Sequence, residues 1–225
     1  MLICLEKFQI NMKNAVVFTH NLLAENFAKT AHGLLRGTDR FNIIAVIDSL
    51  HYGKDAGEVL DGKKANIPVY KSVAEFVDVS DIKAELCIVG VAFPGGVLPK
   101  ECREELIEAI KFKFSIVSGL HHYLSEDSDF VALAKQHSVQ LIDIRKPKAI
   151  SDLRFWSGKI LDINIPIIAV LGTDCAVGKR TTARLILENC KEDGINAELI
   201  YTGQTGWLQG YQHGFIFDAT PNDFV

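Results

Sequence analysis

The stretch Ile165-Pro-Ile-Ile-Ala-Val-Leu171 is a run of apolar residues, and Gly172-Thr-Asp-Cys-Ala-Val-Gly-Lys179 follows it directly. Residues 180–193 have the composition of a helix, and Gly194 stands where helices commonly end. We therefore predict a buried strand, a glycine-containing loop and a helix, which is the context of a phosphate-binding loop, or P-loop. The glycines of such a loop let backbone N–H groups turn toward an anion, the helix N-terminus adds partial positive charge, and Lys179 supplies a full one.

Two features of this loop differ from the usual G-x-x-x-x-G-K-[ST] pattern. Five residues separate Gly172 from Gly178, one more than usual. Arg180 stands where a P-loop places the Ser or Thr that holds Mg²⁺, and Thr181 lies about 100° further around the helix, so it is no direct substitute. The sequence thus predicts phosphate binding and argues against Mg-dependent ATP hydrolysis. Arg180 could itself bind phosphate through its planar guanidinium.

A second glycine loop follows the next apolar stretch. Residues 197–202 are predicted to form a strand that leads into Gly203-Gln-Thr-Gly206. Because ligands of open parallel sheets bind outside the carboxyl ends of the strands, we expect Gln204 and Thr205 to face the P-loop and recognise substrate, with an ordinary turn as the alternative. The predicted phosphate-binding residues are Gly172, Thr173, Asp174, Cys175, Ala176, Val177, Gly178, Lys179, Arg180, Thr181 and Thr182, and the predicted substrate-binding residues are Gly203, Gln204, Thr205 and Gly206.

The N-terminal half shows short apolar runs that alternate with helix-like stretches. The predicted strands are residues 15–19, 42–48, 67–70, 86–90, 115–118 and 140–144; the predicted helices are residues 24–36, 99–112, 128–137 and a short one that begins at Ser72. Continuous apolar strands that alternate with helices predict an α/β fold with a mostly parallel, doubly wound sheet. We expect a Rossmann-like domain at residues 13–145, a connector at 146–164, and the N-terminal part of a P-loop domain at 165–225.

Other residues outside and inside the P-loop are further candidates for a site. Residues 19–23 contain no glycine, so a standard dinucleotide site is not expected after the first strand. Asp48 stands where a ribose-binding acid would stand, but we favour a strand-end acid that faces solvent or acts as a cap. His121 and His122 are candidates for the base that deprotonates an attacking amine, with a structural hydrogen bond as the favoured alternative. Cys175 is expected to fill its tight loop rather than act as a nucleophile, because no base is assignable.

Composition limits the classes of partner. The 225 residues are 48% hydrophobic, carry a net charge of −4, and have scattered Lys and Arg, so a packed core is expected and a nucleic-acid surface is not. No apolar run approaches the roughly 20 residues that cross a bilayer. The five cysteines form no C-x-x-C pair, so reduced thiols in a cytoplasmic protein are expected, without a metal site. The expected partner is a small-molecule substrate, and an incomplete sheet makes a homo-oligomer plausible.

Residues 172–182 together with Thr202-Gly-Gln-Thr-Gly206 resemble the D-glutamate N-acetyltransferase-like family, and the P-loop is also similar to that of dethiobiotin synthetase. The N-terminal stretches that agree with the family are residues 28–36, 55–58, 90–92, 95–96 and 118–121. The resemblance implies a Rossmann-like domain, a P-loop domain similar to dethiobiotin synthetase, and acetyl transfer from acetyl-CoA to the amine of D-glutamate. It also marks Asp218 and Asp223 as family acidic positions. Because family members are longer, we expect the P-loop domain here to be incomplete.

Two other functions stay open on the sequence. An ATP-dependent ligase or kinase similar to dethiobiotin synthetase would use ATP with Mg²⁺, which Arg180 disfavours. A truncated, non-catalytic module would bind a nucleotide or coenzyme A without turnover. The sequence assigns no catalytic residue to any of the three functions.

Overall fold

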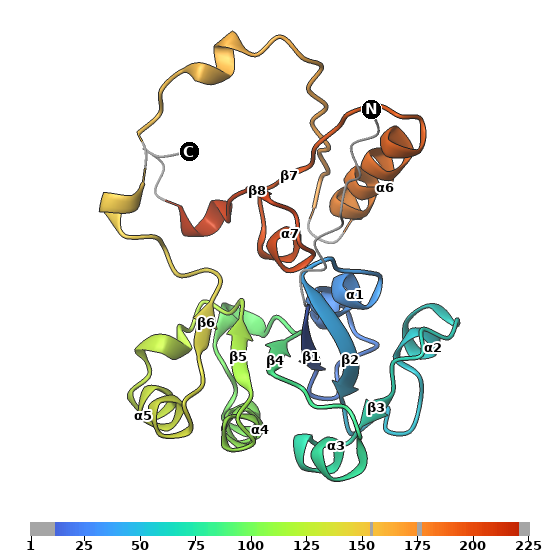
Figure 1. The fold of residues 1–225 in the computed structure, drawn as a ribbon, viewed down its shortest axis with the longest axis vertical. Helices are drawn as coiled ribbons and strands as arrows, with labels where there is room; N and C mark the ends of the chain where they lie inside the picture. Colours follow the sequence, from blue (N-terminus) through green and yellow to red (C-terminus); the bar gives the residue numbers. More distant parts are fainter. Residues whose placement is uncertain (1–11, 154, 175–176, 221–225) are drawn as a thin grey trace, which may run out of the picture.

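A six-stranded parallel sheet is the largest element of the computed structural model, which describes residues 12–153, 155–174 and 177–220 (Figure 1). The strand order is β3-β2-β1-β4-β5-β6, so β1 lies between β2 and β4 where the order reverses. The strands are β1 (Lys13–Phe18), β2 (Phe41–Ile47), β3 (Val69–Tyr70), β4 (Leu86–Val89), β5 (Ser115–Ser118) and β6 (Leu141–Asp143). This is the strand order of a Rossmann-like sheet, and it confirms the predicted α/β fold class.

Helices cover both faces of this sheet. They are α1 (Lys29–Leu35), α2 (Ala56–Asp61), α3 (Val73–Val79), α4 (Lys100–Lys111) and α5 (Ser128–His137). Helices α3, α4 and α5 lie in a row on one side, and α1 contacts α2 on the other (Figure 1). Coverage of both faces explains why β1 and β4 read as uninterrupted apolar runs: the four residues Ala15–Phe18 are completely inaccessible to solvent.

Short side chains set the helix starts of this domain. Asp55 accepts hydrogen bonds from Gly57 N and Glu58 N at the start of α2. Ser72 accepts one from Glu75 N at the start of α3, the short helix that was predicted to begin at Ser72. Such caps satisfy backbone donors that have no partner inside the helix. Short 3₁₀ turns lie at Asn26–Ala28, Pro94–Gly96, Leu124–Glu126, Ile150–Asp152, Lys159–Asp162 and Phe217–Ala219.

The C-terminal part contains α6 (Lys179–Glu192), α7 (Gln204–Leu208) and a two-stranded parallel pair, β7 (Ile200–Tyr201) and β8 (His213–Gly214). Helix α6 ends as predicted, because Gly194 follows it with a φ of 72°, a conformation that favours glycine. The strand predicted at residues 197–202 is shorter than expected and comprises only β7. No helix in the described part of the chain is both long and apolar enough to span a bilayer.

The prediction of a buried strand at residues 165–171 was wrong. None of these residues belongs to a strand, and Ile165, Ile167, Ile168 and Leu171 are between 66% and 85% exposed. A strand is stable when a neighbouring strand satisfies its backbone N–H and C=O groups. Among the described residues no segment pairs with this stretch in a sheet. Its apolar side chains therefore lie on the surface instead of in a core.

Candidate functional site

The P-loop joins the extended stretch at residues 165–171 to the start of α6. Gly178 precedes the helix with a φ of 93°, which explains the glycine at this position. The Lys179 side chain folds back over the loop: its Nζ donates to the Asp174 carbonyl, and its Cγ lies 3.0 Å from where a Cβ on Gly172 would stand. The loop backbone and the Lys179 ammonium thus share one small region, as phosphate binding requires. Cys175 and Ala176, which were predicted to belong to this site, lie outside the described residues.

Arg180 turns toward α1 of the Rossmann-like domain. Its two terminal nitrogens lie 2.8 and 2.9 Å from the position that a Cβ on Gly33 would occupy. One turn later on the same face of α6, Arg184 Nη1 donates to the carbonyl of Arg36 at 3.0 Å. Two consecutive side chains of α6 therefore have different directions, with Lys179 over the loop and Arg180 against α1.

The second glycine loop forms the start of α7 and packs against two glycines of the N-terminal half. Thr205 Cγ2 lies 2.7 Å from the Cβ position of Gly33, beside Arg180. Gln204 Oε1 occupies the space over Gly119, only 1.4 Å from where a Cβ would stand. Gln204 is 8% exposed, and its Oε1 has no hydrogen-bond partner in the described part of the chain. The loop thus lies between the first turn of α6 and the carboxyl end of β5, and its role in substrate recognition stays a prediction.

Side chains of the segment before β2 hold the rest of α7 by donating hydrogen bonds to its backbone carbonyls. Thr38 Oγ1 donates to the Leu208 carbonyl at 2.7 Å, and Arg40 Nε donates to the Trp207 carbonyl at 2.6 Å. The Arg40 guanidinium also lies 4.1 Å from the centre of the Trp207 ring, a cation–π contact. Leu208 is 1% exposed and belongs to the main core. The second glycine loop is therefore fixed on the Rossmann-like domain by both polar and apolar contacts.

A cation, a carboxylate and an imidazole gather at the carboxyl ends of β5 and β6. Arg145 Nε donates to the Gly119 carbonyl at 2.7 Å, and its Nη1 is paired with Asp218. His121 Nε2 lies 3.9 Å from Asp218 Oδ2, and 56% of the His121 side chain is exposed. This cluster adjoins Gln204 through Gly119. His121 and Asp218 were named from the sequence, but Arg145 was not. The position of Arg145, directly after the predicted strand at residues 140–144, could have indicated it. Asp223, the other family acidic position, lies outside the described residues.

Asp48 has a structural role, because each of its two carboxylate oxygens has two hydrogen-bond partners. Its Oδ2 accepts from Thr19 Oγ1 at 2.8 Å and Leu23 N at 3.0 Å, and its Oδ1 accepts from His51 N at 3.1 Å and lies 2.9 Å from His51 Nδ1. The side chain is inaccessible to solvent, so the expectation of a cap was correct and that of a solvent-facing acid was wrong. With two partners on each oxygen, Asp48 is not available to a ribose.

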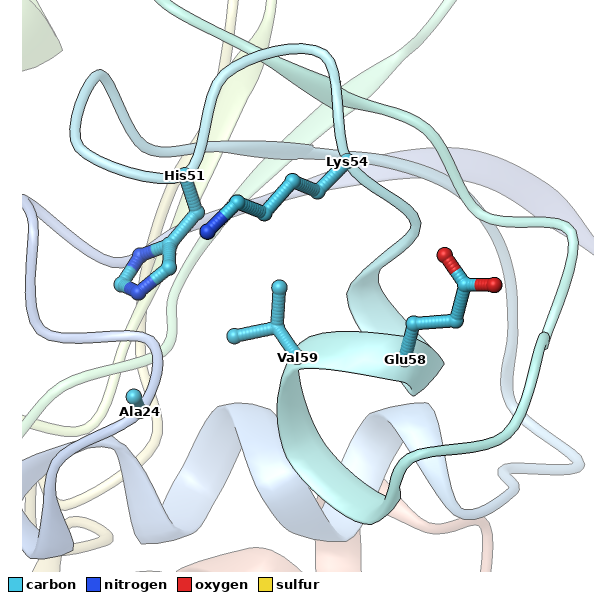
Figure 2. Close-up of a pocket in the computed structure, with 5 residues that line it drawn as sticks. All are labelled: Ala24, His51, Lys54, Glu58 and Val59. Atoms are coloured by element: carbon cyan, nitrogen blue, oxygen red, sulfur yellow. The ribbon is translucent and has the colours of Figure 1, made fainter.

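His51, which the sequence interpretation did not name, lines a pocket of about 290 Å³ together with Ala24, Lys54, Glu58 and Val59 (Figure 2). The His51 ring and the Lys54 side chain both extend over this pocket from the loop after β2 (Figure 2). The contact between His51 Nδ1 and the buried Asp48 fixes the ring orientation. The sequence could have indicated His51, because it follows the strand-end acid Asp48 by three residues.

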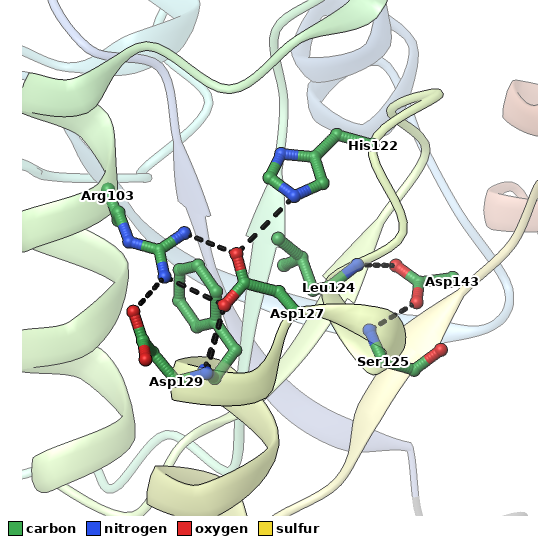
Figure 3. A network of polar contacts seen from close by, with 8 residues as sticks. Arg103, His122, Leu124, Ser125, Asp127, Asp129 and Asp143 are labelled. Atoms are coloured by element: carbon green, nitrogen blue, oxygen red, sulfur yellow. Dashed lines mark hydrogen bonds and ion pairs between the residues drawn. The ribbon is translucent and has the colours of Figure 1, made fainter.

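A polar network that includes His122 fixes the connection between β5 and α5 (Figure 3). Arg103 Nη1 and Nη2 donate to the two oxygens of Asp127 at 2.5 and 2.7 Å, and Asp127 also caps α5. The Arg103 guanidinium is the main reason why the pKa of Asp127 is lowered to about 2. His122 Nε2 lies 3.5 Å from Asp127 Oδ2, whereas its Nδ1 is buried and has no hydrogen-bond partner among the described residues, so a structural hydrogen bond for His122 stays a prediction.

Comparisons with known proteins agree on the two parts of the chain. Residues 49–147 match DUF1611_N, a Rossmann-like domain of unknown function, and residues 154–225 match DUF1611_C, a P-loop domain. A D-glutamate N-acetyltransferase of Pseudoalteromonas sp is 33% identical over 148 residues, which are 66% of this chain and 43% of that protein. A protein of the same name from Tritonibacter scottomollicae is 34% identical over 145 residues, 63% of this chain and 41% of that protein.

A solved structure is also similar. The crystal structure of a DUF1611 family protein from Anabaena variabilis is 30% identical, with a TM-score of 0.82 over 94% of this chain and 59% of that one. The chain spans less than half the length of the two curated relatives and about three fifths of the crystallised one.

The contact between Gln204 and Gly119 predicts a non-additive pair of mutations. We expect Gly119→Ala to lower the free energy of unfolding by about 1–3 kcal/mol, because the new Cβ displaces a buried amide. In a Gln204→Ala background the same substitution should cost much less. Gly203→Ala is the matched control, since its Cβ meets no atom within 4 Å, and it should change stability by less than about 0.5 kcal/mol. Urea denaturation followed by tryptophan fluorescence measures all four; an equal cost of Gly119→Ala in both backgrounds would contradict the contact.

The Asp127–Arg103 pair predicts a pH-dependent loss of stability. Because the pKa of Asp127 is lowered to about 2, the stabilisation is complete above about pH 4 and is lost as the pH falls toward 2. Arg103→Gln should cost roughly 1–3 kcal/mol at pH 7, and the difference from the wild type should shrink as the pH falls through this window. Asp129→Asn, at an acid whose side chain is 78% exposed, serves as the control and should change little. Urea denaturation at several pH values measures the difference, and a difference that does not vary with pH would contradict the ion pair.

Proposed function

The chain belongs to the DUF1611 family, whose Rossmann-like and P-loop domains it carries, and from this premise we propose that it binds acetyl-CoA and transfers the acetyl group to the amine of D-glutamate or a similar amino acid. The observation that carries the proposal is the identity of 33% and 34% to two proteins named D-glutamate N-acetyltransferase. Because the match covers 43% and 41% of those proteins, turnover by this chain is itself part of what must be tested.

The composition of the P-loop supports a cofactor whose phosphates are bound but not cleaved. Lys179 extends over the loop backbone, so an ammonium and backbone donors are present for a pyrophosphate. Arg180 replaces the hydroxyl residue that holds Mg²⁺ in nucleotide-hydrolysing P-loops. Coenzyme A carries a pyrophosphate and a 3′-phosphate, neither of which reacts during acetyl transfer. These features favour acetyl-CoA over ATP with Mg²⁺.

Acetyl-CoA supplies a thioester as the acetyl donor. In the transfer, the amine nitrogen forms a bond to the carbonyl carbon, the carbon–sulfur bond breaks, and a proton moves from nitrogen to a base while the sulfur leaves as a thiol or thiolate. His121 is our candidate for the base, because its ring is exposed beside Asp218 and follows by two residues Gly119, against which Gln204 packs. Arg145 adds positive charge beside the same Asp218 and is a candidate to hold an acidic acceptor.

The Lys179 ammonium can be tested by calorimetric titration. Lys179→Ala should weaken binding of acetyl-CoA by about 10-fold or more, because a charge-assisted hydrogen bond to a phosphate is lost. Lys191→Ala, in the exposed last turn of α6, is the matched control and should bind like the wild type. A parallel titration with ATP and Mg²⁺ separates the alternatives: tight Mg-dependent ATP binding alone would indicate a ligase or kinase. Acetyl-CoA binding without any turnover would indicate a non-catalytic module, and binding unchanged in Lys179→Ala would refute the role of Lys179.

The proposed base can be tested through the reaction itself. His121→Asn should lower kcat for acetylation of D-glutamate by about 100-fold or more, while leaving acetyl-CoA affinity unchanged, because the ring is proposed to move a proton and not to hold the cofactor. The control is His137→Asn at the end of α5, which leads into the amino end of β6, whereas the cluster lies at the carboxyl ends of β5 and β6. A kcat within a few-fold of the wild type would remove His121 from the mechanism.

A further inference from the structure

A cavity of about 190 Å³ lies between α1 of the Rossmann-like domain and α6 of the P-loop domain. Three arginines contribute to its lining: Arg36 from the end of α1, and Arg180 and Arg184 from the first two turns of α6. Arg180 and Arg184 are four residues apart, so both project from the same face of the helix. The cavity is thus a concentration of guanidinium groups at the contact between the two domains.

The charges of this cavity do not balance. Arg36 is paired with Asp61, at 2.7 and 3.0 Å, and Arg184 with Glu188, at 2.6 Å. Arg180 has no hydrogen bond or ion pair with any residue in the described part of the chain, although its guanidinium is packed against Gly33. Burial, with Arg36 and Arg184 nearby, lowers the pKa of Arg180. A partly buried cation without a counter-ion destabilises the folded protein, and a bound anion would compensate the charge of Arg180.

A buried amide in the same cavity is also incompletely bonded. Gln209 is 5% exposed, and its Nε2 donates to the carbonyls of Gly33 and Gly37 at 3.0 and 3.3 Å. Its Oε1 is buried and accepts no hydrogen bond from any described residue. Buried polar atoms without partners are rare in folded proteins, and the residues with the unpartnered acceptor and the unpartnered cation line the same cavity, which points to a ligand with both an anion and a hydroxyl donor.

We propose that this cavity binds a ribose 3′-phosphate of the kind that coenzyme A carries, with Arg180 as the main partner of the phosphate and Gln209 Oε1 as the acceptor for the neighbouring ribose hydroxyl. A phosphomonoester carries about −1.5 to −2 charges at pH 7, which suits one unpaired and two partly neutralised guanidinium groups. The inference rests on the proposed function, because it assigns a second phosphate of the same cofactor.

Adjacent residues on α6 make the two phosphate sites compatible with one ligand. Lys179 and Arg180 project about 100° apart around the helix, one over the P-loop and the other into the cavity. The pyrophosphate would then lie at the P-loop and the 3′-phosphate in the cavity. ATP has no 3′-phosphate, so the cavity gives the chain a means to select coenzyme A over ATP.

Titrations with coenzyme A and 3′-dephospho-coenzyme A test this assignment. The wild type should bind coenzyme A about 10- to 100-fold more tightly than the dephospho form. Arg180→Gln should abolish this preference by weakening only the binding of coenzyme A, and Lys191→Ala should keep it. If Arg180→Gln retains the preference, or if the wild type binds both forms equally in a Lys179-dependent manner, the cavity assignment is wrong while the proposed function stands.

Thermal unfolding without the cofactor provides a second readout. Because Arg180 is an uncompensated cation, Arg180→Gln should have a Tm equal to or above that of the wild type, whereas a purely structural role predicts a lower Tm. Inorganic phosphate should raise the Tm of the wild type and not that of Arg180→Gln. If phosphate does so but neither form of coenzyme A binds, the anion site stands and both coenzyme A as its ligand and the proposed function fail. No phosphate effect on the wild type would overturn the anion site.

Discussion

The contact between the two parts of the chain depends on two positions that have no side chain. Gly33 on α1 and Gly119 after β5 leave the space that Arg180, Thr205 and Gln204 occupy. Protein interiors are densely packed, and a Cβ at either position would stand within 3 Å of atoms of these side chains. The placement of the P-loop helix and of the second glycine loop against the sheet follows from this constraint. Gly33 and Gly119 are therefore as much a part of the candidate site as the polar residues that rest on them.

The strands of the Rossmann-like sheet were predictable because burial on both faces selects uninterrupted apolar residues. Apolar composition also predicted a strand at residues 165–171, and there it failed. Composition reports that side chains favour burial, whereas a strand also needs a partner for its backbone, and none of the described segments pairs with this stretch. The same signal thus predicted β1 correctly, which has a paired strand on both sides, and misled at residues 165–171, with which no described segment pairs.

Some residues of the candidate site could likewise be predicted from the sequence, and others could not. Lys179 and Gln204 could be found from spacing, because a glycine loop between a strand and a helix constrains the residues on either side. Arg145 and Gln209 could not, since their importance arises from contacts between segments that are far apart in the chain. Gln209 donates to a carbonyl 176 residues away, and Arg145 pairs with an acid 73 residues away. No local pattern encodes such pairs, so only the fold reveals that Gln209 has an acceptor without a partner.

Arg180 connects the chemistry of the P-loop with the association of the domains. The substitution that removes the Mg²⁺-holding hydroxyl also places a long cation at the start of α6, and that cation extends to α1. A nucleotide-hydrolysing P-loop uses its metal to neutralise charge that develops on the transferred phosphate. A loop that presents Lys179 and Arg180 in different directions can neutralise two separate phosphates that do not react. Such a loop is suited to a cofactor whose phosphates serve for attachment and whose reactive group lies elsewhere, and this distinction, rather than the P-loop itself, is our reason to propose acetyl transfer instead of phosphoryl transfer for this chain.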